Sequence, residues 1–206
     1  MEGVLAVYTR PHDGERPLVC LDEAAKQLTA ATCTPIAMAP GRPARHDYEY
    51  KRNGTASLFM LFAPLEGWRH VSVRARRAAI DYAQVLKQLS DVHFPKAKSI
   101  VLVQDNLNTH TAASLYRAFP PEEAWRIADR FEWHYTPKHG SWLKMAEAEL
   151  SILARQCLAR RIPDIETLDG QVAALLRRRN KHHAKANWRF TTKNARIKLK
   201  NLYQEI

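Results

Sequence analysis

The sequence has few cysteines and no long apolar run, and each shortage excludes a class of protein. Its three cysteines, Cys20, Cys33 and Cys157, are odd in number and far apart, so they predict neither a disulfide framework nor a zinc site. No apolar stretch is long enough to cross a membrane, and the first residues do not read as a signal peptide. Neither repeats nor low-complexity tracts occur. We therefore expect an intracellular globular protein with no membrane partner.

The chain does carry an excess of positive charge, and that charge is unevenly spread. The 206 residues have a formal net charge of +11, and residues 177–206 hold ten Lys or Arg and one acid. Most of the excess therefore lies in the last thirty residues. A basic stripe of this kind suits a polyanion such as nucleic acid. A solvated basic segment that binds nothing is the alternative.

Hydrophobic periodicity predicts an α/β protein with a mixed sheet. Strands are expected at 16–23, 99–105 and 131–137, and two more within 56–76 joined by a turn near Glu66 and Gly67. Residues 34–54, rich in Pro, Gly, Arg and Tyr, are interpreted as a long loop. Strands come first and helices last, which fits helices packed on the faces of a sheet. Helical spacing predicts helices at 76–94, 111–119, 121–130, 141–161, 164–179 and 191–203.

The chain divides best into two parts. Residues 1–160 hold all the predicted strands and are expected to form the main domain. Residues 161–206 are expected to form a basic helical C-terminal extension that packs on it.

Two aspartates follow buried strands. Asp22 ends the apolar run at 16–23, and Asp105 ends the run at 99–105. In open α/β sheets, sites form at the carboxyl ends of the strands, where the loops converge. One such aspartate would more often be a turn former or a helix cap, but two strand ends make that explanation less satisfactory.

A third carboxylate lies in the helix expected at 141–161. At 100° per residue, Leu143, Leu150, Ala154, Cys157 and Leu158 all fall within about 80° of Glu147, which places Glu147 on the apolar face. Glu149 falls about 200° away and is expected to be a solvated surface acid. A buried carboxylate needs a partner, which here is either an arginine or a divalent metal ion shared with the two aspartates.

Three convergent carboxylates would make an oxygen-ligand site for Mg²⁺ or Mn²⁺. Two such ions, roughly 3.5–4 Å apart, can clamp the attacking and leaving oxygens of an in-line phosphoryl transfer. Water or a 3′-hydroxyl then acts as the nucleophile, so no nucleophilic side chain is needed. The hypothesis assigns Asp22, Asp105 and Glu147 as metal ligands and catalytic residues.

Several long motifs resemble one known family. The stretches "VCLDEAAKQL", "YEYKRNGTASLFMLF", "VQDNLNTHTAASLYRAFPPEEA", "HYTPKHGSWLKMAEAELSILARQCL" and "FTTKNARIKLKNLY" are similar to the catalytic domain of a bacterial insertion-sequence transposase. The family is the mariner-related one called insertion-sequence six-thirty. The resemblance runs from about Val7 to Tyr203, which is nearly the whole chain.

The resemblance implies a ribonuclease-H-like fold and a catalytic Asp-Asp-Glu triad that uses two Mg²⁺ or Mn²⁺ ions. Its motifs place the triad at Asp22, Asp105 and Glu147. It also implies DNA as the partner, both element ends and target, and a homo-oligomer assembled on that DNA. The expected location is the bacterial cytoplasm, at the nucleoid when DNA is bound.

The chain departs from the family pattern in three places. Lys144 stands where asparagine is usual, and its charge would either weaken metal binding or reach toward a DNA phosphate. Ser57 also replaces an asparagine. Met1 lies only about twenty residues before Asp22, so the helix-turn-helix region that such transposases carry is expected to be missing. DNA would then be bound mainly through charge, with little sequence preference.

Other residues carry weaker hypotheses. Asn106 and His110 flank Asp105 and could orient a phosphate or a bound water, or could satisfy backbone groups of a tight turn. Candidate DNA contacts are Lys138, His139, Lys144, Arg177, Arg178, Arg179 and Lys181.

Three functions remain open at this point. The first is a metal-dependent transposase that cuts and joins DNA strands. The second is a catalytically inactive, truncated transposase that binds DNA or a partner protein. The third is a host ribonuclease of the same fold, which the long transposase-like motifs disfavour.

Overall fold

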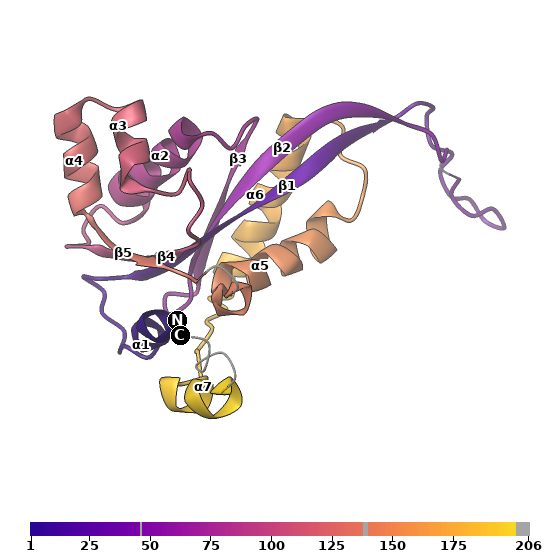
Figure 1. Cartoon of the computed structure of the whole chain (residues 1–206). Coiled ribbons are helices and arrows are strands. Elements are labelled where there is room, and N and C mark those ends of the chain that lie inside the picture. The colour runs from indigo at the N-terminus through magenta and orange to yellow at the C-terminus, as the bar shows by residue number, and fades with distance from the viewer. Residues whose placement is uncertain (46, 138–139, 201–206) are drawn as a thin grey trace.

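The protein is built on a mixed five-stranded sheet (Figure 1). The computed structural model describes residues 1–45, 47–137 and 140–200. The strands are β1 (Leu18–Ala31), β2 (Tyr50–Ala63), β3 (Trp68–Arg74), β4 (Ile100–Gln104) and β5 (Phe131–Tyr135). Their order is β3-β2-β1-β4-β5, with β1, β2 and β3 antiparallel and β1, β4 and β5 parallel. This arrangement confirms the predicted ribonuclease-H-like α/β fold.

Helices cover both faces of the sheet because each central strand buries side chains on both sides. Val19 and Leu21 of β1 pack in one core cluster with α2 (Ala79–Gln88), α3 (Leu115–Ala118) and α4 (Pro121–Asp129). Leu18 and Cys20 pack in the other with α1 (Glu2–Tyr8), α5 (Met145–Leu153), α6 (Ile165–Lys181) and α7 (Thr192–Lys198). Figure 1 shows α2, α3 and α4 gathered on the side of the sheet away from α1, α5 and α6.

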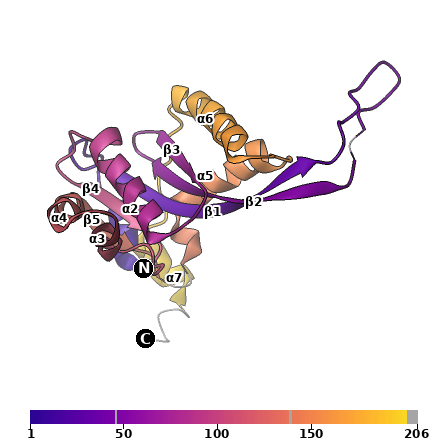
Figure 2. The ribbon, with the colours of Figure 1, turned by 90° about the horizontal axis from the view of Figure 1, so that it is seen from above.

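β1 and β2 are longer than predicted and together form an arm that projects from the helices (Figure 2). They pair antiparallel as far as Ala31 and Tyr50. The expected loop at 34–54 is therefore too long, since β2 already begins at Tyr50. The outer half of β2 is exposed on both faces and carries no hydrophobic alternation that would reveal a strand.

The predicted turn between β2 and β3 is confirmed at Gly67. Its φ of +66° is in the left-handed region, and an added Cβ would lie 2.6 Å from the carbonyl oxygen of His183. Glycine is therefore required both by the turn and by the close passage of the chain after α6.

The predicted helix 141–161 is not continuous. Residues Ser141–Leu143 form a 3₁₀ turn, Lys144 has an extended backbone, α5 follows, and Ala154–Leu158 form a π-helical turn. Each interruption changes the rotation of the side chains about the helix axis. The buried residues within α5 are Met145, Ala146, Glu149, Leu150 and Leu153. Glu149 therefore faces the core, and the expectation that it is a surface acid is wrong.

The other predicted helices are present. The helix expected at 76–94 is α2 followed by a π-helical turn at Leu89–His93, and 111–119 is a 3₁₀ turn followed by α3. α4, α6 and α7 match the remaining three, although positions 201–203 of the last lie outside the described residues. Among the described helices, none is long and apolar enough to span a membrane. A domain boundary between 160 and 161 stays a prediction.

Glu149 joins α5 to the sheet and to α6 through a buried ionic network. The Nε of Arg69, on β3, lies 3.0 Å from Glu149 Oε2, and the Arg69 side chain is fully buried. Arg179 of α6 donates to both carboxylate oxygens at 2.8 and 2.9 Å. Asn180 closes the contact by exchanging two hydrogen bonds with the Arg69 backbone. This network fixes how α5 and α6 are rotated against β3.

We predict that Glu149→Ala strongly destabilises the protein, because it leaves the buried Arg69 charge without its carboxylate. The expected loss is about 3–5 kcal/mol of unfolding free energy. Glu147→Ala is the matched control on the same helix, and because Glu147 is exposed its effect should stay within about 0.5 kcal/mol. Urea unfolding followed by circular dichroism measures both. Equal losses in the two variants would contradict this assignment of the buried carboxylate.

Candidate active site

Asp22 lies where β1 stops pairing with β4. The two strands pair only from Leu18 to Cys20 of β1, whereas β1 continues to pair with β2. The predicted strand end at Asp22 is thus the end of the buried part of the strand, not of the strand itself. Asp22 is 4% exposed, and its Oδ1 accepts the backbone N–H of Glu23 at 2.9 Å. The carboxylate therefore lies just beyond the point where the pairing of β1 with β4 ends.

Asp105 directly follows β4, and the buried amide of Gln104 fixes the chain at that point. The Gln104 side chain accepts a hydrogen bond from Tyr82 Oη at 2.7 Å and donates to the His110 carbonyl at 2.9 Å. The Gln104 carbonyl accepts from Thr136 N at 2.8 Å. Helix α2, the loop after β4 and the end of β5 are therefore tied to one residue. This explains how a loop without glycine holds Asp105 in place.

His110 joins Asp105 to Glu23. Its ring is fully buried, with Nδ1 2.5 Å from Asp105 Oδ1 and Nε2 3.5 Å from Glu23 Oε2. Tyr82 stacks on the ring at a centroid distance of 4.7 Å. Burial alone would lower the pKa of His110, but the two carboxylates outweigh it and raise that pKa to about 9. His110 is therefore a charged donor that orients the Asp105 carboxylate.

Lys144 bridges the two aspartates. Its Nζ lies 3.0 Å from Asp22 Oδ1 and 3.9 Å from Asp105 Oδ2. Burial raises the pKa of Asp22 despite the Lys144 contact. Burial acts in the same direction on Asp105, but His110 and Lys144 together outweigh it and lower the pKa of that carboxyl. Two carboxylates from adjacent parallel strands thus share one ammonium group.

Glu147 does not occupy the buried face that the sequence predicted. It is exposed and lies in the first turn of α5, where it lines an open groove of about 380 Å³ together with Asp22 and Lys144. The helical-wheel prediction failed because it treated 141–161 as one regular helix. Glu147 therefore borders the aspartate site from the solvent side, and its role as a catalytic residue stays a prediction.

The geometry around Lys144 bears on the predicted metal ligands. Asp22 and Asp105 can reach one cation, since both contact the Lys144 ammonium. Across the part of the chain that the structure describes, no three His, Cys, Asp or Glu side chains are grouped to hold a metal ion. In the arrangement seen, the Lys144 ammonium group takes the position between the two carboxylates, and the assignment of Asp22, Asp105 and Glu147 as metal ligands stays a prediction.

The other predicted residues lie apart from this centre. Asn106 is exposed and lines a shallow hollow beside Glu23 and Arg77. Arg177, Arg178 and Lys181 are exposed at the C-terminal end of α6, whereas Arg179 is bound to Glu149. The Glu149 carboxylate thus holds the Arg179 guanidinium, and a role of Arg179 in DNA binding stays a prediction. Lys138 and His139 lie outside the described residues.

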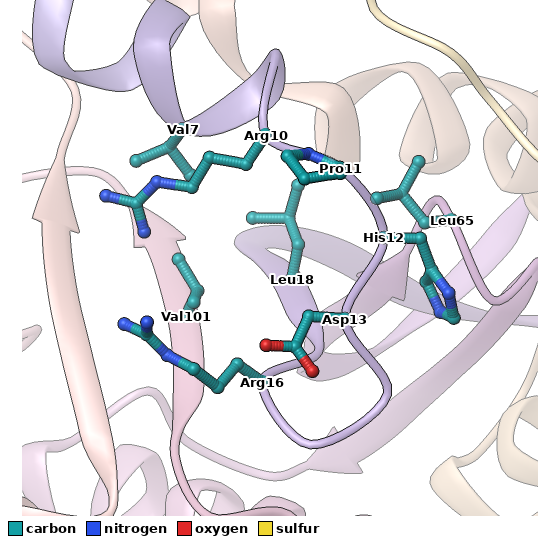
Figure 3. A pocket seen from close by; sticks show the side chains of 9 residues that line it. All are labelled: Val7, Arg10, Pro11, His12, Asp13, Arg16, Leu18, Leu65 and Val101. Carbon is teal, nitrogen blue, oxygen red and sulfur yellow. The ribbon is translucent and has the colours of Figure 1, made fainter.

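A separate cavity of about 190 Å³ lies near the start of β1 and β4, between α1 and the sheet. Figure 3 shows Arg10 and Arg16 on one side of it and His12 on the other. Both arginines are already paired with Glu132. Leu18 and Val101 line this cavity at the beginning of their strands, so it opens at the opposite strand ends from Asp22 and Asp105. It contributes nothing to the aspartate site.

Sequence reasoning missed the residues that support the site. Gln104, Tyr82 and Glu23 were not singled out, although all three hold the loop that carries Asp105 and His110. One signal was present for Gln104, because an amide at the end of an otherwise apolar strand must find buried partners. The pairing of Glu23 with His110 depends on tertiary contact and has no local signal.

Comparison with protein families gives the class of protein. The model of the DDE superfamily endonuclease family matches residues 17–169, which includes Asp22, Asp105 and Glu147. The match covers well over half of the chain, so the chain belongs to the DDE superfamily endonuclease family. A search of curated proteins found no match.

Solved structures with some similarity are complexes of the Mos1 transposase. The Mos1 mariner paired-end complex with Mn has 16% identity and a TM-score of 0.39, over 90% of this chain and 60% of that one. The pre-cleavage Mos1 transpososome has 14% identity and a TM-score of 0.38, over 89% and 59%. The Mos1 strand transfer complex has 16% identity and a TM-score of 0.36, over 90% of this chain and 59% of that one. This chain thus spans about three fifths of the length of those proteins.

The charge of His110 makes a testable contribution to stability. Its pKa is raised from 6.5 to about 9, so protonation favours the folded state. That stabilisation is complete below pH 6.5 and is lost as the pH rises through about 9. We expect the unfolding free energy of the wild type to fall across this range and that of His110→Gln to fall less.

Urea unfolding at both ends of this pH range measures the effect. His12→Gln is the control, because His12 is an exposed histidine paired with Glu66 away from the aspartates. The control should keep the wild-type pH dependence. Identical pH dependence in the wild type and His110→Gln would contradict the charged state assigned to the buried ring.

Proposed function

We propose that this chain is the catalytic domain of a bacterial insertion-sequence transposase of the mariner-related family called insertion-sequence six-thirty. Its reaction is phosphoryl transfer on DNA, with strand cleavage by water and strand transfer by a 3′-hydroxyl. The main support is the pair Asp22 and Asp105, which two adjacent parallel strands bring to one shared cation within a DDE family match. The proposed substrates are the DNA ends of the element and target DNA. The proposed location is the bacterial cytoplasm, and the proposed active form is a homo-oligomer assembled on that DNA.

The residues of the site have distinct proposed roles. Asp22 and Asp105 supply the negative charge that gathers cations at the reacting phosphate, and His110 holds the Asp105 carboxylate in position. Mg²⁺ or Mn²⁺, when bound by such carboxylates, supplies charge stabilisation for the attacking and leaving oxygens. In this arrangement Lys144 takes the position between the aspartates, so a divalent ion could contact both carboxylates only after the lysine side chain has moved.

A second function is favoured by the same lysine. If Lys144 never leaves the aspartates, the chain is a catalytically inactive transposase domain that binds DNA or a partner protein. DNA binding would then depend on the basic end of α6 and the segment after it. The exposed residues there are Arg177, Arg178 and Lys181.

DNA-nicking activity distinguishes these two functions. The wild-type chain should nick supercoiled DNA in the presence of Mg²⁺ or Mn²⁺, and Asp105→Asn should lower the rate on the order of 10²-fold or more, because it removes charge at the reacting phosphate. Agarose gels measure the nicking, and circular dichroism checks the fold. Asp129→Asn, an exposed aspartate on α4, is the control and should keep the wild-type rate.

Equal nicking by the wild type and Asp105→Asn would identify the activity as contamination. DNA binding by the wild type without nicking would favour the catalytically inactive DNA-binding domain.

The basic C-terminal segment, which is the end of α6 and the residues after it, is predicted to contact DNA. Replacing Arg177, Arg178 and Lys181 together by Gln should weaken binding to duplex DNA and flatten its salt dependence, because fewer phosphates are neutralised. Arg179 stays unchanged, since its removal would also disturb Glu149. Gel-shift titrations at several salt concentrations measure both quantities, and unrelated duplexes should bind alike.

A charge-matched control separates local contact from net charge. Replacing exposed Lys51, Lys96 and Arg117 by Gln removes the same charge from other elements and should leave the salt slope closer to that of the wild type. If the two triple variants weaken binding equally, the segment has no special role in DNA binding.

A further inference from the structure

Lys144 contacts both aspartates. Its Nζ is within hydrogen-bond distance of Asp22 Oδ1, at 3.0 Å, and within ion-pair distance of Asp105 Oδ2, at 3.9 Å. Its side chain is 17% exposed, beside 6% for that of Asp22 and 20% for that of Asp105. The ammonium group thus lies between a carboxylate on β1 and a carboxylate of the residue that directly follows β4.

The backbone holds the lysine in this place. Lys144 is the residue before α5, between buried Leu143 and buried Met145. Tyr8 Oη donates a buried hydrogen bond to the Leu143 carbonyl at 2.6 Å. Because its neighbours are anchored in the core, Lys144 enters the site from a fixed point and lacks the freedom of a lysine on an exposed loop.

The two carboxylates need such a charge. Asp22 is almost fully buried, and like charges close together in a partly dry site repel more strongly than in water. An ammonium group relieves this repulsion with one positive charge, and a divalent ion would relieve it with two. The two cations would occupy overlapping positions, so they cannot both contact Asp22 and Asp105 in the arrangement seen.

We propose that Lys144 is a built-in cation that occupies the position between Asp22 and Asp105 and keeps a divalent ion out until its side chain withdraws. This inference rests on the proposed function, because it concerns how the same aspartates admit metal. The groove lined by Lys144, Glu147 and Ser151 gives the side chain a place to move into. Metal binding by the wild type is therefore weak because of one residue.

The direct test is Mn²⁺ binding to the full chain, followed by electron paramagnetic resonance of free Mn²⁺. Lys144→Gln should bind Mn²⁺ roughly tenfold or more tightly than the wild type, because the competing charge is gone. Lys144→Arg keeps the charge and should not gain affinity. Adding Asp22→Asn to Lys144→Gln should remove the gain, which would place the bound ion at the aspartates.

Thermal unfolding gives an independent readout. Without metal, Lys144→Gln should melt at a lower temperature than the wild type, and Mn²⁺ should restore the loss by binding the folded state. Lys87→Gln is the matched control, because Lys87 also contacts two carboxylates, Asp91 and Glu123, in a cluster away from this site. It should melt lower without any response to Mn²⁺. If Lys144→Gln does not fold, Lys144→Met keeps the apolar stem and replaces it in both experiments.

The outcomes separate this inference from the proposed function. Equal Mn²⁺ affinity in the wild type and the neutral variants would overturn the role of Lys144, even if the wild type nicks DNA. A gain in Mn²⁺ affinity without DNA nicking by the loaded variant would support the role of Lys144 and count against the proposed transposase activity.

Discussion

The site depends on one constraint: two neighbouring carboxylates, buried Asp22 and partly buried Asp105, need positively charged partners. β1 and β4 diverge after three paired residues, and the gap between them holds Asp22 and Asp105 at the edge of the core. Burial disfavours the charged form of a carboxylate, so nearby cations stabilise both aspartates. His110 supplies one from the loop after β4, and Lys144 supplies the other from the start of α5. The site therefore combines two carboxylates, on β1 and after β4, with two positive groups, one on the loop after β4 and one at the start of α5.

A second buried ion pair sets the direction from which Lys144 arrives. Glu149 is clamped between Arg69 on β3 and Arg179 on α6, which fixes the rotation of α5. That rotation leaves Glu147 facing the open groove while the residue before the helix points its ammonium at Asp22. The network distant from the aspartates therefore determines which carboxylate of this helix is buried and which is exposed.

Sequence periodicity predicted the elements whose signal is local. The buried runs before Asp22 and Asp105 identified both strands and the two aspartates at one sheet edge, because parallel neighbours end on the same side. The outer part of the β1–β2 arm was missed, since strands exposed on both faces show no alternation. The sequence predicted that Glu147 is buried and Glu149 exposed, and the structure shows the reverse. A 3₁₀ turn and a π turn interrupt the helix, and a helical wheel cannot reveal either. The contact of Lys144 with two aspartates is tertiary and could not be predicted from spacing.

The central claim is that an ammonium group, and not a divalent ion, fills the space between the aspartates in the resting chain. A crystal structure of the wild type grown in excess MnCl₂, with an anomalous difference map, tests it most directly. We predict Lys144 Nζ beside Asp22 and Asp105, and no anomalous peak between the two carboxylates. A manganese peak shared by Asp22, Asp105 and Glu147, with Lys144 turned into solvent, would contradict it.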